Sequence, residues 1–226
     1  MSEIDIEVWV DVVCPWSYIG KRRLERAVAE SAHPAEVTVT YRAYELDPTK
    51  PSRSGRSVLS RMADRHRNGD EQAHEAAQRA ALIARPDGID MDLDTMVDAN
   101  TFDAHRMVAL GLAQGGPALQ AAVLERLFYA HFTEGKAIDD HETLQRLGAE
   151  AGLDGRRLAA VLASRDYAAE VRADEQAAKE LAIAATPCFV ANRSAALVGA
   201  HTVEVMGKLI TAALDGEHVP AGQSTR

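Results

Sequence analysis

Hydrophobic and polar positions alternate at the start of the chain. Between Ile4 and Val13 an aliphatic side chain occupies every second position until an apolar pair closes the run, which predicts a strand in or near the middle of a sheet. From Ser17 the apolar positions recur at helical spacing, and the pair His33 and Pro34 marks the end of that pattern. Alternation returns over residues 37–44 and stops at a proline-rich turn. The start of the chain therefore predicts a strand, a helix and a second strand.

A helical pattern replaces this alternation between residues 52 and 185. Alanine-rich segments with helical periodicity are interrupted by short breaks that contain glycine and proline. No strand candidate falls in this part, so it predicts several helices joined by short turns. The predicted helical segments are 70–84, 101–114, 117–132, 140–151 and 154–184, and the last of them contains a long, charged helix from residue 166 onward.

Strand-like patterns return near the end of the chain. Short apolar segments over 185–191 and 195–198 are separated by turn residues, and apolar residues at helical spacing predict a final helix over 202–214. The order of elements is thus β-α-β, several helices, then β-β-α. It predicts an α/β fold in which a discontinuous sheet domain is interrupted by a helical domain. The expected boundaries are 1–50 with 185–226 for the first domain, and 51–184 for the second.

Composition and charge narrow the class of protein. With 46% apolar and 26% charged residues, the chain can bury a core without disulfides. Its 25 basic and 34 acidic residues give a net charge of −9, which argues against nucleic acid as the main partner. No apolar run approaches the roughly 18 residues of a membrane span, and the acidic N-terminus lacks the basic region of a signal peptide. We therefore expect a cytoplasmic protein that binds neither nucleic acid nor membrane.

The two cysteines, Cys14 and Cys188, lie far apart and resemble neither a secreted disulfide framework nor a metal site, and the eight histidines have no metal-ligand spacing either. We expect no metal. Cys14 lies where the first strand passes into the first helix, and Pro15 suits a first helical turn. Unpaired N–H groups and the helix dipole favour a thiolate there, so we expect a reactive cysteine with a lowered pKa. A buried, inert cysteine is the alternative.

The segment 11–20, Asp-Val-Val-Cys-Pro-Trp-Ser-Tyr-Ile-Gly, resembles the active-site segment of the DsbA family of thioredoxin-like oxidoreductases, most closely its FrnE-like branch. Four further segments are similar to family segments in the same order: 44–48, 100–106, 132–135 and 171–175. The resemblance implies a thioredoxin-like fold with an inserted α-helical domain and thiol-disulfide oxidoreductase activity on peptide or small-molecule thiols and disulfides. It implies no covalently bound cofactor. Related proteins often dimerise, so a homodimer is among the expected assemblies.

The resemblance also implies roles for single residues. Cys14 corresponds to the nucleophile, and Pro15 and Trp16 shape the helix start and contribute to substrate binding. Thr186 and Pro187 match the position of the cis-proline that faces the cysteine in thioredoxin-like folds, where the backbone before the proline forms a wall for an extended substrate. An ordinary trans proline that enters an edge strand is the alternative.

Ser17 departs from the FrnE-like pattern, which has a second cysteine three residues after the first. A hydroxyl cannot resolve a mixed disulfide, so dithiol chemistry within this motif is excluded. We expect monothiol chemistry in which Ser17 hydrogen-bonds the Cys14 thiolate, and in which a low-molecular-weight thiol such as glutathione, or Cys188, resolves the mixed disulfide. A bridge between Cys14 and Cys188 requires close, convergent Cβ atoms. The other interpretation of Cys188 is a small, buried, inert strand residue.

A second resemblance leads to a different class of function. Kappa-class glutathione transferases and 2-hydroxychromene-2-carboxylate isomerases share the implied fold, and their active-site segment has a serine at the position of Cys14. The positions around it fit that pattern too: Val12, Val13, Pro15 and Ser17. In those enzymes the serine binds and activates the thiol of glutathione, so the alternative function is an isomerase or transferase that depends on glutathione or another thiol cofactor. A third interpretation is a redox-silent thioredoxin-fold binding module.

Overall fold

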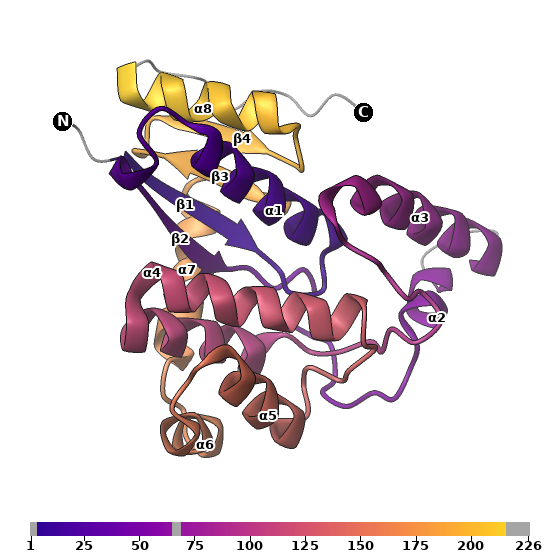
Figure 1. Cartoon of the computed structure of the whole chain (residues 1–226). Helices are drawn as coiled ribbons and strands as arrows, with labels where there is room; N and C mark the ends of the chain where they lie inside the picture. Colours follow the sequence, from indigo (N-terminus) through magenta and orange to yellow (C-terminus); the bar gives the residue numbers. More distant parts are fainter. Residues whose placement is uncertain (1–3, 65–68, 216–226) are drawn as a thin grey trace. The chain divides into compact units, whose positions relative to one another are not determined.

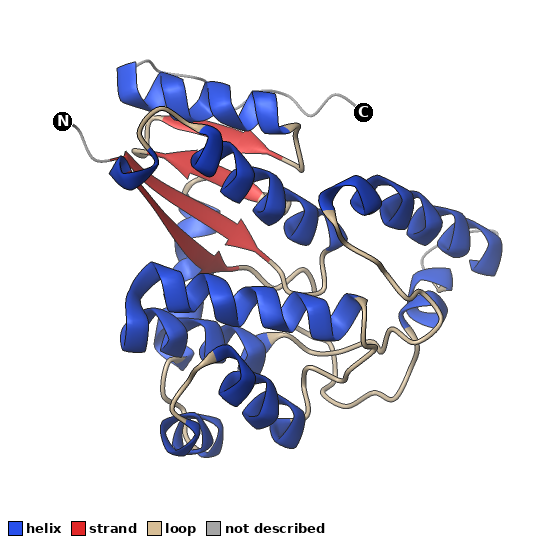
Figure 2. Ribbon diagram, in the orientation of Figure 1, coloured by secondary structure: helices blue, strands red, loops and turns tan. Residues whose placement is uncertain are grey.

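The computed structural model describes residues 4–64 and 69–215, which form two compact units. The sheet unit contains the described chain up to Leu46 and from Ala169 onward, and the helical unit contains Asp47–Ala168. Figure 1 follows the chain through both units, and Figure 2 shows that the strands of the described chain all belong to the sheet unit. An α/β architecture with an inserted helical part, as the order of elements predicts, is therefore observed.

The sheet unit is built on a four-stranded sheet in the order β2-β1-β3-β4. The strands are β1 (Ile4–Val10), β2 (Val37–Ala43), β3 (Cys188–Ala191) and β4 (Ala195–Val198). β1 pairs in parallel with β2 and antiparallel with β3, and β3 pairs antiparallel with β4. The helical elements of this unit are α1 (Pro15–Glu30), the 3-10 helix η1 (Pro34–Glu36), α7 (Ala168–Glu180) and α8 (Val203–Asp215).

Alternation along the strands divides the sheet into two faces. Phe189 of β3 points toward Gly20 on α1, whereas its neighbour Cys188 forms a hydrophobic cluster with Trp9 of β1 and Ala178 of α7. Successive residues of a strand point to opposite faces. α1 and α8, which contact each other, therefore cover one face, and α7 covers the other (Figure 1). The central strand β1 is buried on both faces, which explains why its apolar residues are not confined to alternate positions.

Helix α7 belongs to the sheet unit, although the expected boundaries place it in the helical domain, 51–184. The Trp9 indole N–H donates to the Asp174 carbonyl at 2.9 Å, and the Asp174 carboxylate accepts the Ala43 N–H at 3.0 Å. These bonds fix α7 to the two parallel strands. Helical periodicity identifies the face of a helix that is buried but not the element that buries it. The boundary between the units consequently lies near Ala168 and not near residue 184.

The helical unit follows the predicted helical segments except at two places. A six-residue helix, α2, has no counterpart in the sequence pattern because it is too short to establish a period. The single segment expected over 154–184 is divided between α6 and α7. In the described residues the elements of this unit are α2 (Val58–Ala63), α3 (Gly69–Ala84), the 3-10 helix η2 (Arg85–Asp87), α4 (Phe102–Phe132), α5 (His141–Ala151) and α6 (Gly155–Ala163).

Helix α4 is interrupted near its middle, where the sequence predicts a break. Gly115 and Gly116 have non-helical backbone angles, and the φ of Gly116 is 67°, a conformation that favours glycine. By length and composition, α4 is the described helix that is apolar enough to cross a membrane. Each of its halves is shorter than the roughly 20 residues that span a bilayer, and the buried Arg106 forms an ion pair with Asp103. We therefore interpret α4 as two consecutive core helices of the helical unit.

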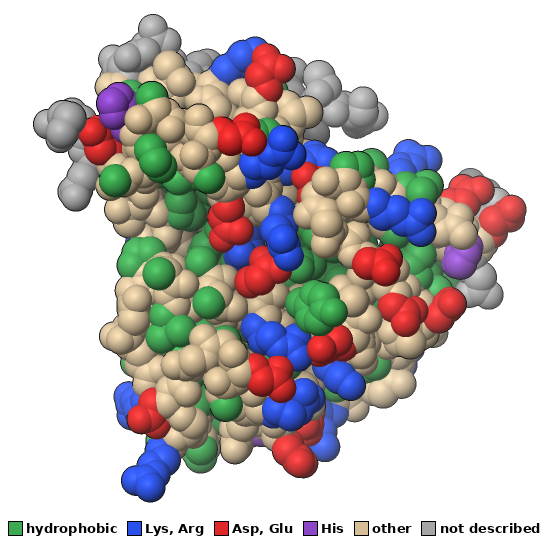
Figure 3. All heavy atoms as spheres, in the orientation of Figure 1, with side chains coloured by type: hydrophobic (Ala, Val, Ile, Leu, Met, Phe, Trp, Pro, Cys, Tyr) green, Lys and Arg blue, Asp and Glu red, His purple; other side chains and the backbone are tan. Residues whose placement is uncertain are grey.

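Charged side chains of both signs are interspersed on the face of the molecule drawn in Figure 3. On α1, Arg26 pairs with Glu30 at 2.8 Å, and on α8, Lys208 pairs with Glu204 at 2.7 Å. Such exposed pairs contribute little to stability. Because positive and negative side chains are mixed, the face drawn has no broad patch of purely positive or purely negative charge.

Candidate active site

Cys14 lies where the central strand passes into a helix. β1 ends at Val10, a short turn follows, and Cys14 is the N-cap of α1 with extended backbone angles, φ −91° and ψ 114°. Its N–H donates to the Asp11 carbonyl at 3.0 Å, and its carbonyl accepts the Ser17 N–H at 3.0 Å. Pro15 occupies the start of the helix, where its missing N–H costs nothing. The local sequence thus places the sulfur at the carboxyl end of β1 and the N-terminus of α1.

The segment before β3 faces this thiol. The Thr186–Pro187 peptide bond is cis, and the Cys14 thiol donates to the Thr186 carbonyl, with 3.6 Å between Sγ and the oxygen. Pro187 is held against α1 at Gly20, and its carbonyl accepts the Gly199 N–H at 2.8 Å. The structure therefore brings together Cys14, Thr186 and Pro187, although Cys14 and Thr186 are 172 positions apart in the sequence.

Ser17 is fully buried in the first turn of α1 and acts on the sulfur directly. Its hydroxyl and its N–H both lower the pKa of the Cys14 thiol, and the N–H also donates to the Cys14 carbonyl oxygen at 3.0 Å. The Asp11 N–H donates to Ser17 Oγ at 3.4 Å and so helps to orient the hydroxyl. Ser17 thus stands at the position of a resolving cysteine with a group that can donate a hydrogen bond but cannot form a disulfide.

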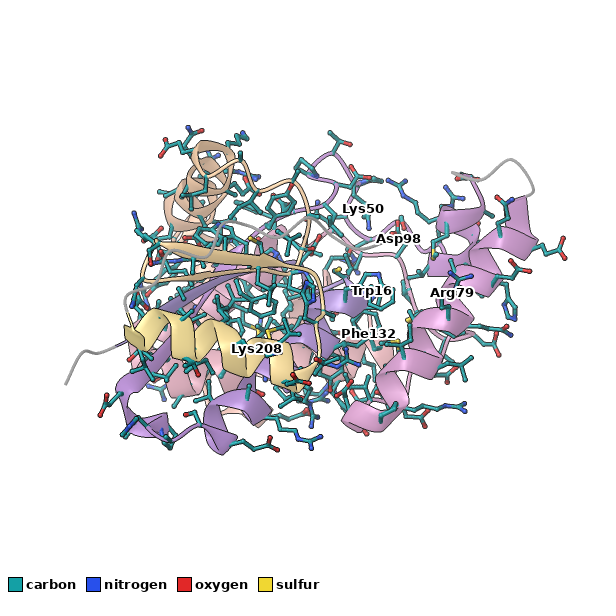
Figure 4. All side chains as sticks on the ribbon, turned by 90° about the horizontal axis from the view of Figure 1, so that it is seen from above. Trp16, Lys50, Arg79, Asp98, Phe132 and Lys208 are labelled. Carbon is teal, nitrogen blue, oxygen red and sulfur yellow. The ribbon has the colours of Figure 1, made fainter. Side chains whose placement is uncertain are left out.

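Pro15 and Trp16 follow the thiol in the chain and form the first residues of α1. Both side chains are half-buried, and Trp16 is labelled in Figure 4. Each therefore keeps part of its surface exposed. Their role in substrate binding stays a prediction.

The buried carboxylate of Asp11 organises the turn before the thiol. Oδ2 accepts the Leu46 N–H at 2.8 Å, and Oδ1 accepts the Val13 N–H at 3.5 Å. These bonds tie the end of β1 to the segment that follows β2. Because the carboxylate is a negative charge near Cys14, it raises the pKa of the thiol.

Burial has the largest effect on the ionisation of Cys14. The residue is 4% exposed, and desolvation raises the pKa of its thiol above the ordinary value. The side chain of Thr186 and both donors of Ser17 oppose this rise, the Asp11 charge adds to it, and the net direction is upward. The lowered pKa that we expect from the helix N-terminus is therefore wrong for the protein at rest. The reason is that removal of the thiol from water outweighs the favourable field of the helix.

Cys188 lies on the other face of the sheet from α1. It packs with Trp9, Ala178 and Val190 in the cluster under α7, whereas the next residue, Phe189, points toward α1. Both cysteines are free, and burial raises the pKa of Cys188 to about 11. The structure thus does not direct the Cys188 side chain toward Cys14, and it gives Cys188 the surroundings of an inert, apolar residue.

A charged cluster that the sequence does not predict lies beside the active-site turn. Nη1 of Arg172 on α7 donates to Glu45 at 2.5 Å and to Glu175 at 2.7 Å. The Glu45 side chain is 1% exposed; burial raises its pKa, Arg172 opposes the rise, and Glu175 adds to it. Leu46, which follows Glu45, donates to Asp11. The signal for this cluster is the resemblance of segments 44–48 and 171–175 to family segments, but nothing in the sequence indicates that the two segments meet.

Two buried ionic residues of the helical unit, Arg106 and Asp98, bond to other residues of that unit. Arg106 donates to the carbonyls of Ser164 and Asp166, both at 2.9 Å, and so holds the chain after α6. Lys50 and Asp98, labelled in Figure 4, form an ion pair at 2.7 Å. Residues 4–64 and 69–215 contain no group of three or more His, Cys, Asp or Glu side chains that could hold a metal ion.

Comparisons with known proteins cover nearly the whole chain. The family model described as a DSBA-like thioredoxin domain matches residues 5–211. A solved structure described as a probable DsbA oxidoreductase from Streptomyces coelicolor has 33% sequence identity and a TM-score of 0.88, and the match covers 97% of this chain and 93% of that one. A search among curated proteins found no match.

Two more distant structures share the fold. The cytosolic disulfide reductase DsbM from Pseudomonas aeruginosa has 20% identity and a TM-score of 0.61, with 93% of this chain and 96% of that chain covered, and it has also been solved with GSH. A 2-hydroxychromene-2-carboxylate isomerase has 19% identity and a TM-score of 0.67, with 94% and 99% covered. Together the matches confirm the predicted thioredoxin-like α/β fold.

Proposed function

Because the chain belongs to the family of DSBA-like thioredoxin domains, we propose that it is a thiol-disulfide oxidoreductase that works through a single active-site thiol, Cys14. The observation that carries the proposal is the placement of the Cys14 sulfur at the start of α1, 3.6 Å from the Thr186 carbonyl oxygen. The Ser17 hydroxyl and N–H lower the pKa of the thiol and so favour its thiolate form. The Cys14 sulfur thus faces a backbone carbonyl and has polar groups nearby that favour its charged form.

The reaction begins when Cys14 loses its proton to solvent. The thiolate attacks one sulfur of a disulfide substrate, a new S–S bond forms to Cys14, the substrate S–S bond breaks, and the departing thiolate takes up a proton. Ser17 cannot attack the mixed disulfide, and Cys188 lies under α7 with a pKa raised to about 11. A second thiol from solution therefore completes the exchange.

We propose a low-molecular-weight thiol such as glutathione for this second step. Support comes from the DsbM structure with GSH, a protein of the same fold, and from the motif itself, which provides no resolving thiol. Both cysteines of this chain are free. Exchange of this kind suits a reducing compartment, so we place the protein in the cytoplasm.

The test uses oxidised glutathione and three proteins: wild type, Cys14→Ser and Cys188→Ala. Each is incubated with the disulfide, and intact mass spectrometry counts the glutathione adducts. We expect one adduct on the wild type and on Cys188→Ala and none on Cys14→Ser, and we expect excess reduced glutathione to remove it.

An adduct on Cys188, or no adduct on any protein, would contradict the proposal. If no adduct forms while reduced glutathione still binds reversibly, the thiol-dependent isomerase or transferase becomes the better interpretation. If glutathione neither reacts nor binds, the redox-silent binding module does.

A further inference from the structure

The segment that follows β2 carries a buried acid, Glu45, next to the turn that holds Cys14. The Glu45 side chain is 1% exposed, and its carboxylate accepts a hydrogen bond from Nη1 of Arg172 on α7 at 2.5 Å. A carboxyl group that has been removed from water needs a bonded partner. Arg172 therefore holds the Glu45 side chain in a fixed place, and with it this segment of the chain.

The residues on either side of Glu45 bond to the end of β1 and to the active-site turn. The Tyr44 N–H donates to the Val10 carbonyl at 3.0 Å, and the Leu46 N–H donates to Oδ2 of Asp11 at 2.8 Å. The Leu46 side chain is half exposed, so its own packing contributes little to the position of this N–H. The buried anchor that directly precedes it, Glu45, therefore helps to place the N–H.

The Asp11 carboxylate is the group through which this placement reaches the sulfur. Asp11 is buried, its carbonyl accepts the Cys14 N–H at 3.0 Å, and its charge raises the pKa of the Cys14 thiol. A backbone N–H that points at a carboxylate presents the positive end of a dipole, which offsets part of the negative charge felt by neighbouring atoms. The Leu46 N–H therefore weakens the effect of Asp11 on Cys14.

Resting on the function proposed above, we propose that Glu45 is a positioning residue of the active site, which acts through the Leu46 N–H on the Asp11 carboxylate. The bond between Glu45 and Arg172 keeps the N–H on that carboxylate. The N–H in turn offsets part of the negative charge that opposes the thiolate of the nucleophile. Helix α7, which carries Arg172, thus contributes to the reactivity of the thiol although it lies on the other face of the sheet from α1.

The charged groups that face Glu45 come from α7 and from the turn after β1. Helix α7 supplies Arg172 and also Glu175, which accepts from the same Nη1 at 2.7 Å, whereas Asp174 of this helix is engaged by β2. Burial raises the pKa of Glu45, Arg172 opposes the rise, and Glu175 adds to it. The turn after β1 supplies Asp11, whose charge acts directly on the thiol of the nucleophile. A change at Glu45 therefore reaches the sulfur by way of Asp11.

The experiment measures the ionisation of Cys14 when single links of this path are removed. Wild type and variants are alkylated with iodoacetamide over a range of pH, and mass spectrometry of the peptide that contains Cys14 gives the rate at that residue. Glu45→Ala removes the anchor, whereas Glu45→Gln keeps an oxygen that accepts from Arg172. Asp11→Asn removes the charge on which Glu45 acts, and the double variant shows whether the two substitutions affect the thiol by the same path.

We expect the pKa of Cys14 to rise by about 0.5 pH unit in Glu45→Ala, so that alkylation and adduct formation with oxidised glutathione at neutral pH become about threefold slower. Glu45→Gln should keep the wild-type profile. In the Asp11→Asn background, Glu45→Ala should leave the pKa unchanged, because the charge that the N–H offsets is gone. Glu170→Ala, which removes an exposed carboxylate of α7, is the control and should not alter the profile.

Arg172→Ala tests the path from the other side of the ion pair. Its side chain is half exposed, so this variant decides the question if Glu45→Ala does not fold, and we expect the pKa of Cys14 to rise here too. No rise in either variant, or an equal rise in the Asp11→Asn background, would overturn the positioning proposal while the proposed function stands. If the wild type forms no glutathione adduct on Cys14, the proposed function fails instead.

Discussion

Gly20 of α1 and Pro187 approach each other so closely that a Cβ on Gly20 would lie 2.8 Å from Pro187 Cγ. The same Cβ would lie 2.9 Å from Cζ of Phe189. No side chain fits at this position, and the absence of one lets α1 lie against the segment that carries Thr186. The contact thereby sets the separation between the thiol at the start of α1 and the carbonyl that faces it.

Substitution of Gly20 by alanine should push α1 away from Pro187. We expect Gly20→Ala to lower the free energy of unfolding by about 1–3 kcal/mol, the usual cost of overpacking a core, and to slow adduct formation at Cys14. Urea denaturation measures the first effect. Gly207→Ala is the matched control, because Gly207 lies in α8 with open space around its Cβ position. That change should stabilise the protein by up to about 1 kcal/mol through helix propensity. Equal effects of the two substitutions would refute the steric account.

The negative charge of Asp11 should hold back ionisation of the thiol. Asp11→Asn removes the charge that raises the pKa of Cys14 and keeps an oxygen for the Leu46 N–H. We expect the pKa of Cys14 to fall and alkylation by iodoacetamide at neutral pH to become faster. The measurement is the pH profile of the alkylation rate. Asp5→Asn serves as the control, because Asp5 is an exposed residue of β1, the strand that leads to Asp11. An unchanged profile in Asp11→Asn would show that its charge does not reach the sulfur.

A second cysteine at position 17 should convert the site to dithiol chemistry. Ser17 is buried in the first turn of α1 and hydrogen-bonds Cys14, so the thiol of Ser17→Cys lies next to the nucleophile. We expect this variant to form an intramolecular disulfide and to catalyse the reduction of insulin by dithiothreitol faster than the wild type does. Ser31→Cys, at the other end of α1, should leave insulin reduction unchanged. Insulin reduction by the wild type at the rate of Ser17→Cys would contradict the monothiol assignment.

Glu45 should make the stability of the protein depend on pH. Burial and the neighbouring Glu175 raise its pKa in the folded state, so the folded protein binds a proton more tightly than the unfolded chain does. The contribution of Glu45 to stability is fully present below about pH 4.3, the ordinary pKa of glutamate. It is lost as pH rises through the pKa of Glu45 in the folded state. The free energy of unfolding of the wild type relative to Glu45→Gln should therefore fall as pH rises toward neutrality.

Glu204 provides a control of opposite sign. The Lys208 ammonium lowers the pKa of this exposed carboxyl on α8, so its contribution is present at neutral pH and is lost as pH falls. The free energy of unfolding of the wild type, relative to that of Glu204→Gln, should therefore increase as pH rises. Urea titrations at several pH values measure both differences, and the same sign for both would show that the Glu45 cluster does not hold a raised pKa.

Cys188 should be unreactive while the protein is folded. Its thiol is buried in the cluster under α7, and its pKa is raised to about 11. Iodoacetamide at pH 8 should label the native wild type at Cys14 alone and label both cysteines in concentrated urea. Cys188→Ala should lose about 1 kcal/mol of stability through lost packing and keep full adduct formation at Cys14. Labelling of Cys188 before Cys14 in the native protein would show that Cys188, and not Cys14, is the reactive cysteine.

Local patterns determined the order of elements and pointed to Cys14 as the proposed nucleophile. Alternation over Ile4–Val10 and helical spacing after Pro15 depend only on neighbouring residues, so a strand followed by a helix could be predicted without a structure. The chemistry of Ser17 is equally local, because a hydroxyl in place of a thiol excludes dithiol exchange in any fold. The resemblance to one family placed Thr186 and Pro187 opposite Cys14.

Tertiary structure decided whatever depends on which elements meet. Periodicity could not show that α7 packs on Trp9 and belongs with the sheet, nor that Cys188 points to that face and away from α1. The ionisation of Cys14 is the clearest case. A helix N-terminus predicts a lowered pKa from neighbouring residues alone, whereas desolvation is a property of everything packed around the sulfur, and it raises the pKa.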